Sequence, residues 1–229
     1  MFNFYSKNIA NGFGSLEGDE AGHCSRVLRK QEGDFITVID GVGGSHECVI
    51  SSISKKVVEF EVKSSIQYER GSGYIELVVA PTKNISRIEW LLEKATEIGV
   101  DSICFIQCNH SERKVVKLER LTKILVSAMK QSGNLYLPTL KDLNSFKSVL
   151  SEPFDGSRLY GSCDSSEKRL MDFKGLDQVQ FWIGPEGDFS TEEVDFLKSE
   201  GVKPVSLSQS RLRTETAALV AVCQLRTLI

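Results

Sequence analysis

From Tyr74 to the C-terminus, short apolar runs alternate with segments whose apolar residues recur at helical spacing. Such alternation of strands and helices is typical of an α/β domain built on a largely parallel sheet. The runs that predict strands are residues 74–80, 100–108, 158–161, 179–183 and 204–207. Because sheets of this kind bind ligands beyond the carboxyl ends of their strands, we expect a site just after Gly161, Ile183 and Leu207.

The segments between these runs predict helices. They cover residues 86–98, 117–129 and 142–150, a stretch that begins at Ser190, and residues 215–228. Ser86 with Glu89 has the spacing of a capping box, and Gly99 suits the end of the first helix. Ser190 with Glu193 has the spacing of a second capping box. The last segment is apolar on nearly all sides, which indicates a helix buried in the domain or against a partner.

The first 70 residues have a different pattern. Residues 35–39, 47–51 and 56–62 are apolar runs separated by Asp-Gly and Gly-Gly pairs, which favour a small antiparallel sheet or barrel. The charged, glycine-rich segment 69–73 is interpreted as a linker. With 229 residues, of which 41% are hydrophobic, the chain is long enough for one large domain or two modest ones, with a real core.

The sequence lacks the motifs of membrane, secreted and metal-binding proteins. The sequence has no apolar run long enough for a membrane helix and no secretory signal at its start, so we expect a cytoplasmic protein without a membrane span. Its 6 cysteines form no C-x-x-C pair and lie near no histidine cluster. This pattern predicts free thiols in a reducing compartment and no metal site.

The distribution of charge is more informative than its sum. A net charge of −3 argues by itself against nucleic-acid binding, which needs clustered lysine and arginine. Basic residues nevertheless outnumber acidic ones between His110 and Lys147 and again after Val202, whereas acidic residues dominate between Ser148 and Val202. This separation suits either an ordinary solvated surface or a protein with one basic and one acidic face.

Two loops have features of ligand sites. Residues 183–190 (IGPEGDFS) follow an apolar strand, and their glycines and proline allow a sharp turn that approaches a ligand. A tight connection without any ligand explains them at least as well, and they match neither dinucleotide nor P-loop motifs. Residues 207–217 place Arg211 and Arg213 beside a helix N-terminus, where a cation needs an anionic partner. Either Glu215 or a negatively charged substrate can be that partner.

Two further segments concentrate charge. His110 opens the basic stretch and is either a surface histidine or a catalyst. Arg26, Arg29 and Lys30 place three cations within five residues, on either a solvated helix face or a surface that contacts phosphates.

Taken together, these segments resemble the family of 16S ribosomal RNA (uracil-N3)-methyltransferases, the small-subunit methyltransferase E type. The matching segments occur in family order and cover most of the chain: residues 23–29 with 33–34, 89–100, 111–113 (SER), 131–133 (QSG), 184–187 (GPEG) and 212–217 (LRTETA). GPEG followed at this distance by LRTETA is the most specific part of the match.

The resemblance implies an α/β protein with two domains. Residues 1–70 are expected to form a PUA-like β-barrel that binds RNA, and residues 74–229 a SPOUT α/β methyltransferase domain with a mostly parallel sheet and a C-terminal trefoil knot. The resemblance also implies S-adenosylmethionine as the cofactor, 16S ribosomal RNA of the small ribosomal subunit as the substrate, and a homodimer.

Three positions depart from the family pattern. Asp188 stands where a glycine usually follows GPEG, which puts an extra carboxylate near the cofactor loop. Asn134 stands where an arginine commonly follows QSG, and residues 1–5 lack the usual arginine, so two possible RNA contacts are missing.

Three groups of site residues follow for this sequence. The expected catalytic residues are Arg213, Arg211 and Glu215. The residues expected around the cofactor are Gly161, Ile183, Gly184, Pro185, Glu186, Gly187, Leu207, Ser208, Ser210, Leu212 and Thr214. The residues expected to contact RNA are Arg26, Arg29, Lys30, Ser111, Glu112, Arg113, Lys114 and Gln131.

A mechanism follows from the chemistry of uracil. Methyl transfer to N3 requires loss of the N3 proton, after which negative charge spreads onto the flanking carbonyl oxygens. A guanidinium aimed at these oxygens stabilises that charge; Arg213 is the first candidate and Arg211 the second. Glu215 either holds the arginine or takes the proton, and holding is favoured because an exposed glutamate is a weak base at pH 7. Two alternatives stay open: a non-catalytic RNA-binding assembly factor, and an enzyme that clamps a small acidic metabolite with the two arginines.

Overall fold

The structure is a computed structural model that describes residues 3–164 and 166–229. The chain forms two compact units. The first combines the residues up to Gly71 with Val126–Leu137, and the second comprises Ser72–Leu125 and Pro138–Ile229. Among the described residues, no helix combines the length and the apolar character that crossing a membrane requires.

The second unit contains, within its described residues, a six-stranded sheet whose strand pairs are all parallel. In spatial order the strands are β12 (Lys203–Ser206), β10 (Ser157–Ser162), β11 (Gln178–Ile183), β7 (Tyr74–Val79), β8 (Ser102–Gln107) and β9 (Thr139–Ser145). β7 and β11 are buried along nearly their whole length, as expected for strands covered on both faces. The predicted α/β class with a parallel sheet is confirmed.

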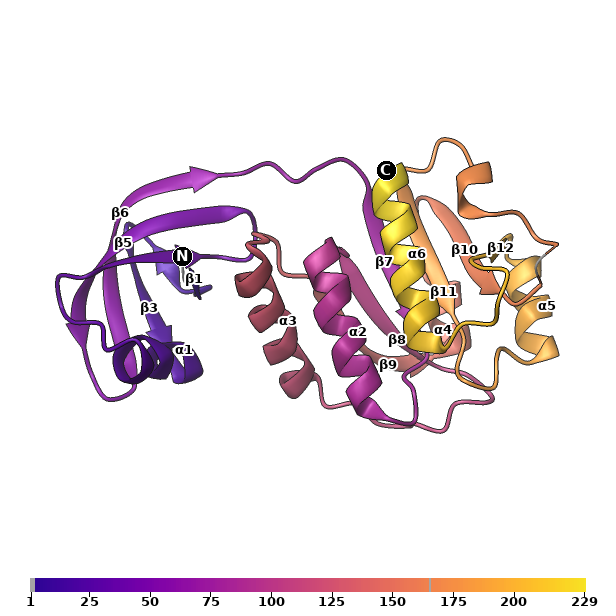
Figure 1. The fold of residues 1–229 in the computed structure, drawn as a ribbon, viewed down its shortest axis with the longest axis horizontal. Coiled ribbons are helices and arrows are strands. Elements are labelled where there is room, and N and C mark those ends of the chain that lie inside the picture. The colour runs from indigo at the N-terminus through magenta and orange to yellow at the C-terminus, as the bar shows by residue number, and fades with distance from the viewer. Residues whose placement is uncertain (1–2, 165) are drawn as a thin grey trace. The chain divides into compact units, whose positions relative to one another are not determined.

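Helices cover both faces of this sheet (Figure 1). α2 (Ile85–Ile98) and α6 (Thr214–Leu228) pack against each other, and α6 also packs on β7 and β11. On the other face, α4 (Phe146–Ser151) and α5 (Thr191–Ser199) contribute to a core cluster that contains the fully buried Trp182. The helices therefore leave the carboxyl ends of the strands to the connecting loops.

The prediction of a helix over residues 142–150 is wrong in its first half. Thr139–Ser145 forms strand β9, which pairs with β8 at the edge of the sheet and contains a register shift. Polar residues suit an edge strand, whose side chains reach solvent on its open side. Ser145 then caps α4, because its side chain accepts a hydrogen bond from the N–H of Ser148.

The sequence pattern predicts the N-terminal cap of α5 (Thr191–Ser199) correctly, but not that of α2 (Ile85–Ile98). At α5, Ser190 and Glu193 form the predicted capping box. At α2, the predicted box of Ser86 with Glu89 is wrong, because the capping residue is Asn84, whose side chain accepts a hydrogen bond from the N–H of Ser86. Asparagine caps helices as well as serine does, so the helix begins earlier than the sequence pattern indicated.

The described part of the first unit is built on another six-stranded sheet. Its order is β1 (Asn3–Tyr5), β4 (Phe35–Ile39), β5 (Gly44–Ile53), β6 (Val57–Gln67), β3 (Phe13–Glu17) and β2 (Ile9–Ala10). The strands β4, β5 and β6 are the predicted antiparallel set, but β1 pairs with β4 in parallel. A parallel pair needs a long crossover, and this one contains α1 (Gly18–Gly22) and the π-helical turn His23–Val27.

The helix α3 (Leu118–Ser132) contributes to both units, since its residues from Val126 onward belong to the first. Within that unit, Lys130 forms an ion pair with Glu20 at 2.5 Å. Tyr136, which follows the helix, donates its hydroxyl hydrogen to the carbonyl of Tyr68 at 2.7 Å. A segment distant in sequence thus completes the N-terminal unit.

An ion pair anchors α6 to the sheet. Gly99 ends α2 in the left-handed conformation, as predicted, with φ of 101°. The buried carboxylate of Asp101 then accepts hydrogen bonds from the N–H of Ile75 at 2.7 Å and from Arg226 of α6 at 2.5 Å.

Arg226→Ala removes the ion pair between α6 and the buried Asp101 carboxylate. We therefore expect the free energy of unfolding to fall by roughly 1–3 kcal/mol, measured by urea denaturation. Arg226→Lys keeps the charge and should lose less. An alanine variant as stable as the wild type would show that this pair does not anchor the helix.

Candidate active site

A cavity of about 300 Å³ lies at the carboxyl ends of β10, β11 and β12 and at the start of α6. Its described lining consists of residues 161–163, 183–186, 188, 207–208, 210–214 and 217. This is the edge at which parallel α/β sheets bind ligands, and the volume is within the range of small-molecule pockets. The segments predicted to follow three strand ends therefore meet at one place.

Two glycines let the chain pass close to neighbouring segments at this cavity. A Cβ on Gly161 would lie 3.0 Å from Cδ1 of Ile183, and a Cβ on Gly184 would lie 3.1 Å from the backbone nitrogen of Phe189. Both distances are shorter than ordinary contacts of a Cβ atom. Larger residues at these positions would push the cavity walls out of place.

The turn after Gly184 fixes an acidic side chain in the cavity wall. The N–H of Asp188 donates to the carbonyl of Pro185 at 2.9 Å. Asp188 adopts φ of 66°, a left-handed conformation that aspartate tolerates better than most residues. Its carboxylate accepts a hydrogen bond from the N–H of Phe189 at 2.8 Å.

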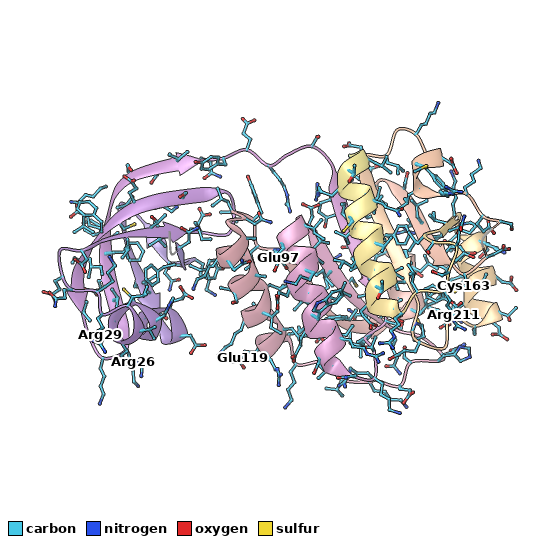
Figure 2. The ribbon with its side chains drawn as sticks, viewed as in Figure 1. Arg26, Arg29, Glu97, Glu119, Cys163 and Arg211 are labelled. Carbon is cyan, nitrogen blue, oxygen red and sulfur yellow. The ribbon has the colours of Figure 1, made fainter. Side chains whose placement is uncertain are left out.

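Cys163 lies in the same wall, and Figure 2 shows it at the same end of the unit as Arg211. Burial is the main cause that raises the pKa of the Cys163 thiol, and the carboxylate of Asp188 raises it further. The guanidinium of Arg211 lowers the same pKa. The negative charge of Asp188 and the positive charge of Arg211 therefore act on one spot of the cavity wall.

Loops that follow β7 and β8 support the turn at 184–188. The side chain of Glu186 accepts a hydrogen bond from the N–H of Lys83 at 3.0 Å. Nδ1 of His110 lies 3.1 Å from the carbonyl oxygen of Gly187 and 3.0 Å from that of Asp188. Since both partners are acceptors, this nitrogen carries the hydrogen. His110 thus holds the turn in position.

The RNA contacts predicted after β8 belong to these supporting loops. They are Ser111, Glu112, Arg113 and Lys114. Arg113 donates hydrogen bonds to the carbonyl oxygens of Thr82 and Lys83, so its guanidinium binds the protein's own backbone. Ser111 is buried, whereas the side chain of Lys114 is exposed. Lys114 is therefore better placed than Arg113 to contact RNA.

The other predicted RNA contacts lie in the first unit. Arg26 and Arg29 are found near α1 at one end of this unit (Figure 2). Arg29 has φ of 53°, in the left-handed region. The ammonium group of Lys30 donates to the carbonyl of Phe35 at 3.1 Å, and Gln131 is exposed near the end of α3.

Arg211 and Arg213 both line the cavity, directly before α6. The expected pairing of Glu215 with one of them is wrong. Among the described residues, the ion pair of Glu215 is with Arg87 of α2, whose Nε lies 3.6 Å from Oε1. Glu215 is also buried, with 6% of its surface exposed, because α2 packs against α6 there.

Within the described part of the chain, every residue predicted around the cofactor lines this cavity except Gly187. A Cβ on Gly187 would lie 3.0 Å from Cβ of His110, so this glycine makes room for the supporting histidine. Ser162, Cys163 and Ala217 were not predicted. The first two lie at the end of β10, where the strand-end rule was a sufficient signal. In residues 3–164 and 166–229, no group of three or more His, Cys, Asp or Glu is placed to hold a metal ion.

Two family models match this chain. A model described as the RNA methyltransferase domain matches residues 70–226, and one described as the RNA methyltransferase PUA domain matches residues 16–63. The solved structure of a probable rRNA-methyltransferase from Porphyromonas gingivalis is 40% identical and has a TM-score of 0.91, over 100% of this chain and 98% of that chain.

Relatives named ribosomal RNA small subunit methyltransferase E are similar over nearly the whole chain. A ribosomal RNA small subunit methyltransferase E from Neisseria gonorrhoeae, solved bound to S-adenosyl methionine, is 27% identical with a TM-score of 0.87, over 100% of this chain and 98% of that chain. The ribosomal RNA small subunit methyltransferase E of Bacillus subtilis is 28% identical over 225 residues, which cover 90% of this chain and 87% of the relative.

These matches confirm the predicted combination of a PUA-like first part with a methyltransferase domain. They also confirm the resemblance carried by the GPEG and LRTETA segments, which meet at the cavity. This chain belongs to the RNA methyltransferase family and, within it, to the family of ribosomal RNA small subunit methyltransferase E.

Proposed function

We propose that this protein transfers a methyl group from S-adenosylmethionine to N3 of a uridine in the 16S ribosomal RNA of the small subunit. The observation that carries this proposal is the cavity in which the turn at 184–188 and the arginine bend at 211–213 meet, beyond the ends of three parallel strands. The neisserial relative with the same fold was solved with this cofactor bound.

The chemistry of the cavity fits the cofactor. Ile183, Leu207 and Leu212 provide apolar walls for a flat adenine ring. The absent side chain of Gly161 leaves space that a Cβ would otherwise take, and Ser208 and Ser210 bring hydroxyl groups. Such a mixture of apolar walls and a few polar groups is typical of cofactor sites. When bound, S-adenosylmethionine supplies the methyl group on a positively charged sulfur.

The side chains of the protein act on the uracil ring. Once N3 has lost its proton, negative charge spreads onto the two neighbouring carbonyl oxygens. We assign Arg213 to these oxygens, with Arg211 beside it, because a guanidinium presents several donors in a fixed plane. Glu215 and its partner Arg87 hold the first turn of α6, and so hold the backbone that precedes it at Arg213.

The target uridine must be unpaired or flipped out, since base pairing hides N3, and flipping costs a few kcal/mol. Contacts to phosphates offset this cost. We assign them to the exposed residues Arg26, Arg29, Gln131 and Lys114 and to the partly buried Lys30. Ser111, Glu112 and Arg113 are instead assigned to support of the loops around the cavity.

The remaining features concern the organisation of the protein. We assign residues 1–70 to an RNA-binding domain and residues 74–229 to the methyltransferase domain with its C-terminal trefoil knot. The protein acts as a homodimer in the cytoplasm, where its ribosomal substrate is made. The exposed side chains of Met171 and of Leu228, the last residue of α6, are the surface that a second copy would cover. Analytical ultracentrifugation tests the dimer.

Labelled cofactor tests the reaction. Purified protein is incubated with methyl-labelled S-adenosylmethionine and with small subunits, or their RNA, that lack the modification. We expect label in 16S RNA, at N3 of a uridine after nuclease digestion and mass spectrometry. Failure to bind the cofactor in calorimetry would favour a non-catalytic assembly factor. Turnover of a small acidic metabolite without RNA would favour the other alternative.

Thiol labelling tests where the cofactor binds. Cys163 in the cavity wall and Cys223 on α6 are both accessible to solvent. Neighbouring protein atoms still bury part of each thiol, which raises the pKa of both. Both therefore react faster as the pH rises toward the thiol pKa. We expect S-adenosylmethionine to slow alkylation of Cys163 several-fold and to leave Cys223 unchanged, measured by peptide mass spectrometry. Equal protection of both, or of neither, would contradict this location.

A further inference from the structure

The described lining of the cavity carries charges of both signs. Arg211 and Arg213 bring two guanidinium groups, and Glu186 and Asp188 bring two carboxylates. Glu186 is exposed, and its Oε1 accepts the hydrogen bond from the N–H of Lys83. Asp188 is half-buried, so its charge is less screened by water.

The position of the Asp188 carboxylate is fixed by the backbone. The turn with Pro185 and the left-handed φ of 66° set the direction of the side chain, and the N–H of Phe189 binds one carboxylate oxygen at 2.8 Å. Asp188, Arg211 and Cys163 line the same cavity, and the two charges act in opposite directions on the pKa of the Cys163 thiol. A ligand that touches this wall therefore meets both.

The cofactor and its product differ in charge at one atom. S-adenosylmethionine carries a positive charge on its sulfur. S-adenosylhomocysteine, the product of methyl transfer, lacks the methyl group and has a neutral sulfur, and the rest of the molecule is the same. The guanidinium groups of the lining do not favour the charged form over the neutral one. A carboxylate in the same wall does, because its attraction acts on the charged sulfur and is lost with that charge.

On the basis of the proposed function, we infer that Asp188 is a specificity-determining residue, whose carboxylate is the counter-ion of the cofactor's sulfonium and favours the methyl donor over its product. For turnover, this means that the product S-adenosylhomocysteine binds more weakly than the S-adenosylmethionine from which it was formed. The product then leaves in exchange for fresh donor.

Two substitutions isolate the charge. Asp188→Asn keeps the shape of the side chain, an oxygen for the N–H of Phe189, and the tolerance of the left-handed conformation. Asp188→Gly removes the side chain and also accepts this conformation. Calorimetric titration of the full-length wild type and both variants with S-adenosylmethionine and with S-adenosylhomocysteine gives four dissociation constants for the variants and two for the wild type.

We expect Asp188→Asn to weaken binding of S-adenosylmethionine about tenfold, which is about 1.4 kcal/mol. Binding of S-adenosylhomocysteine should change much less. Asp188→Gly should shift the ratio of the two constants in the same direction. Equal losses for both ligands would overturn the inference, because Asp188 would then contact a part that both share, such as the ribose. Unchanged binding of both ligands would overturn it as well. A wild type that binds neither ligand would instead overturn the proposed function.

Discussion

Arg213→Ala should lower the rate of methyl transfer by two to three orders of magnitude while the affinity for S-adenosylmethionine stays within a few-fold of the wild type. Loss of one donor that stabilises developing charge raises a barrier by roughly 2.7–4 kcal/mol. The effect falls on the chemical step because we assign Arg213 to the uracil oxygens and not to the cofactor. Single-turnover transfer at saturating cofactor measures the rate, and calorimetry measures the affinity.

The fold should tolerate this substitution. Arg213 precedes α6 in an extended conformation, and in the described structure its side chain makes no capping hydrogen bond, so alanine removes none. Arg213→Lys is the matched control: it keeps the charge but loses the planar set of donors, and should recover only part of the rate. Arg211→Ala should cost less than Arg213→Ala. If Arg213→Ala retains full transfer, the assigned role is wrong.

Trp182→Ala should lower the free energy of unfolding by roughly 3–5 kcal/mol. Trp182 is fully buried in the core cluster beneath the site, and its ring meets that of Phe146 edge-on, with centroids 5.5 Å apart. Its indole N–H donates to Oε1 of Gln180 at 2.9 Å. Alanine therefore leaves both a cavity and a buried acceptor without its donor. Urea denaturation followed by circular dichroism measures the loss.

Two controls separate these contributions. Trp182→Phe keeps most of the ring volume and leaves the Gln180 oxygen without the indole donor, so it should cost roughly 1–3 kcal/mol. Trp90→Ala removes the same side chain from a position that is 42% exposed and should cost about 1 kcal/mol. Equal losses for the alanine variants at positions 182 and 90 would contradict the packing argument.

The network behind Trp182 is one that the sequence did not indicate. The amide of Gln180 also donates to the buried carboxylate of Glu76 at 2.7 Å, and Lys141 pairs with the same carboxylate at 2.6 Å. In the sequence, Glu76 interrupts an apolar strand without apparent reason. Its partners come from β9 and β11, so only the lateral order of the strands explains why a charge is tolerated there.

The outcome at residues 139–151 shows the same limit of local patterns. Leucines spaced among polar residues there suit an amphipathic helix, yet Thr139–Ser145 pairs with β8 as an edge strand. Hydrogen bonds to a neighbouring strand outweigh the weak preference of a short segment. The pairing of Glu215 with Arg87 was likewise missed, because it depends on α2 lying beside α6.

By itself, the sequence determined the alternation of strands and helices, the parallel sheet, and the glycine-rich and arginine-bearing segments at the strand ends, since local periodicity and turn chemistry are written in neighbouring residues. Only the tertiary structure decided that Val126–Leu137 completes the N-terminal unit, and that Asp188 and Arg211 share a wall with Cys163. These facts depend on contacts between residues far apart in the chain, and the order in which strands and helices pack determines such contacts.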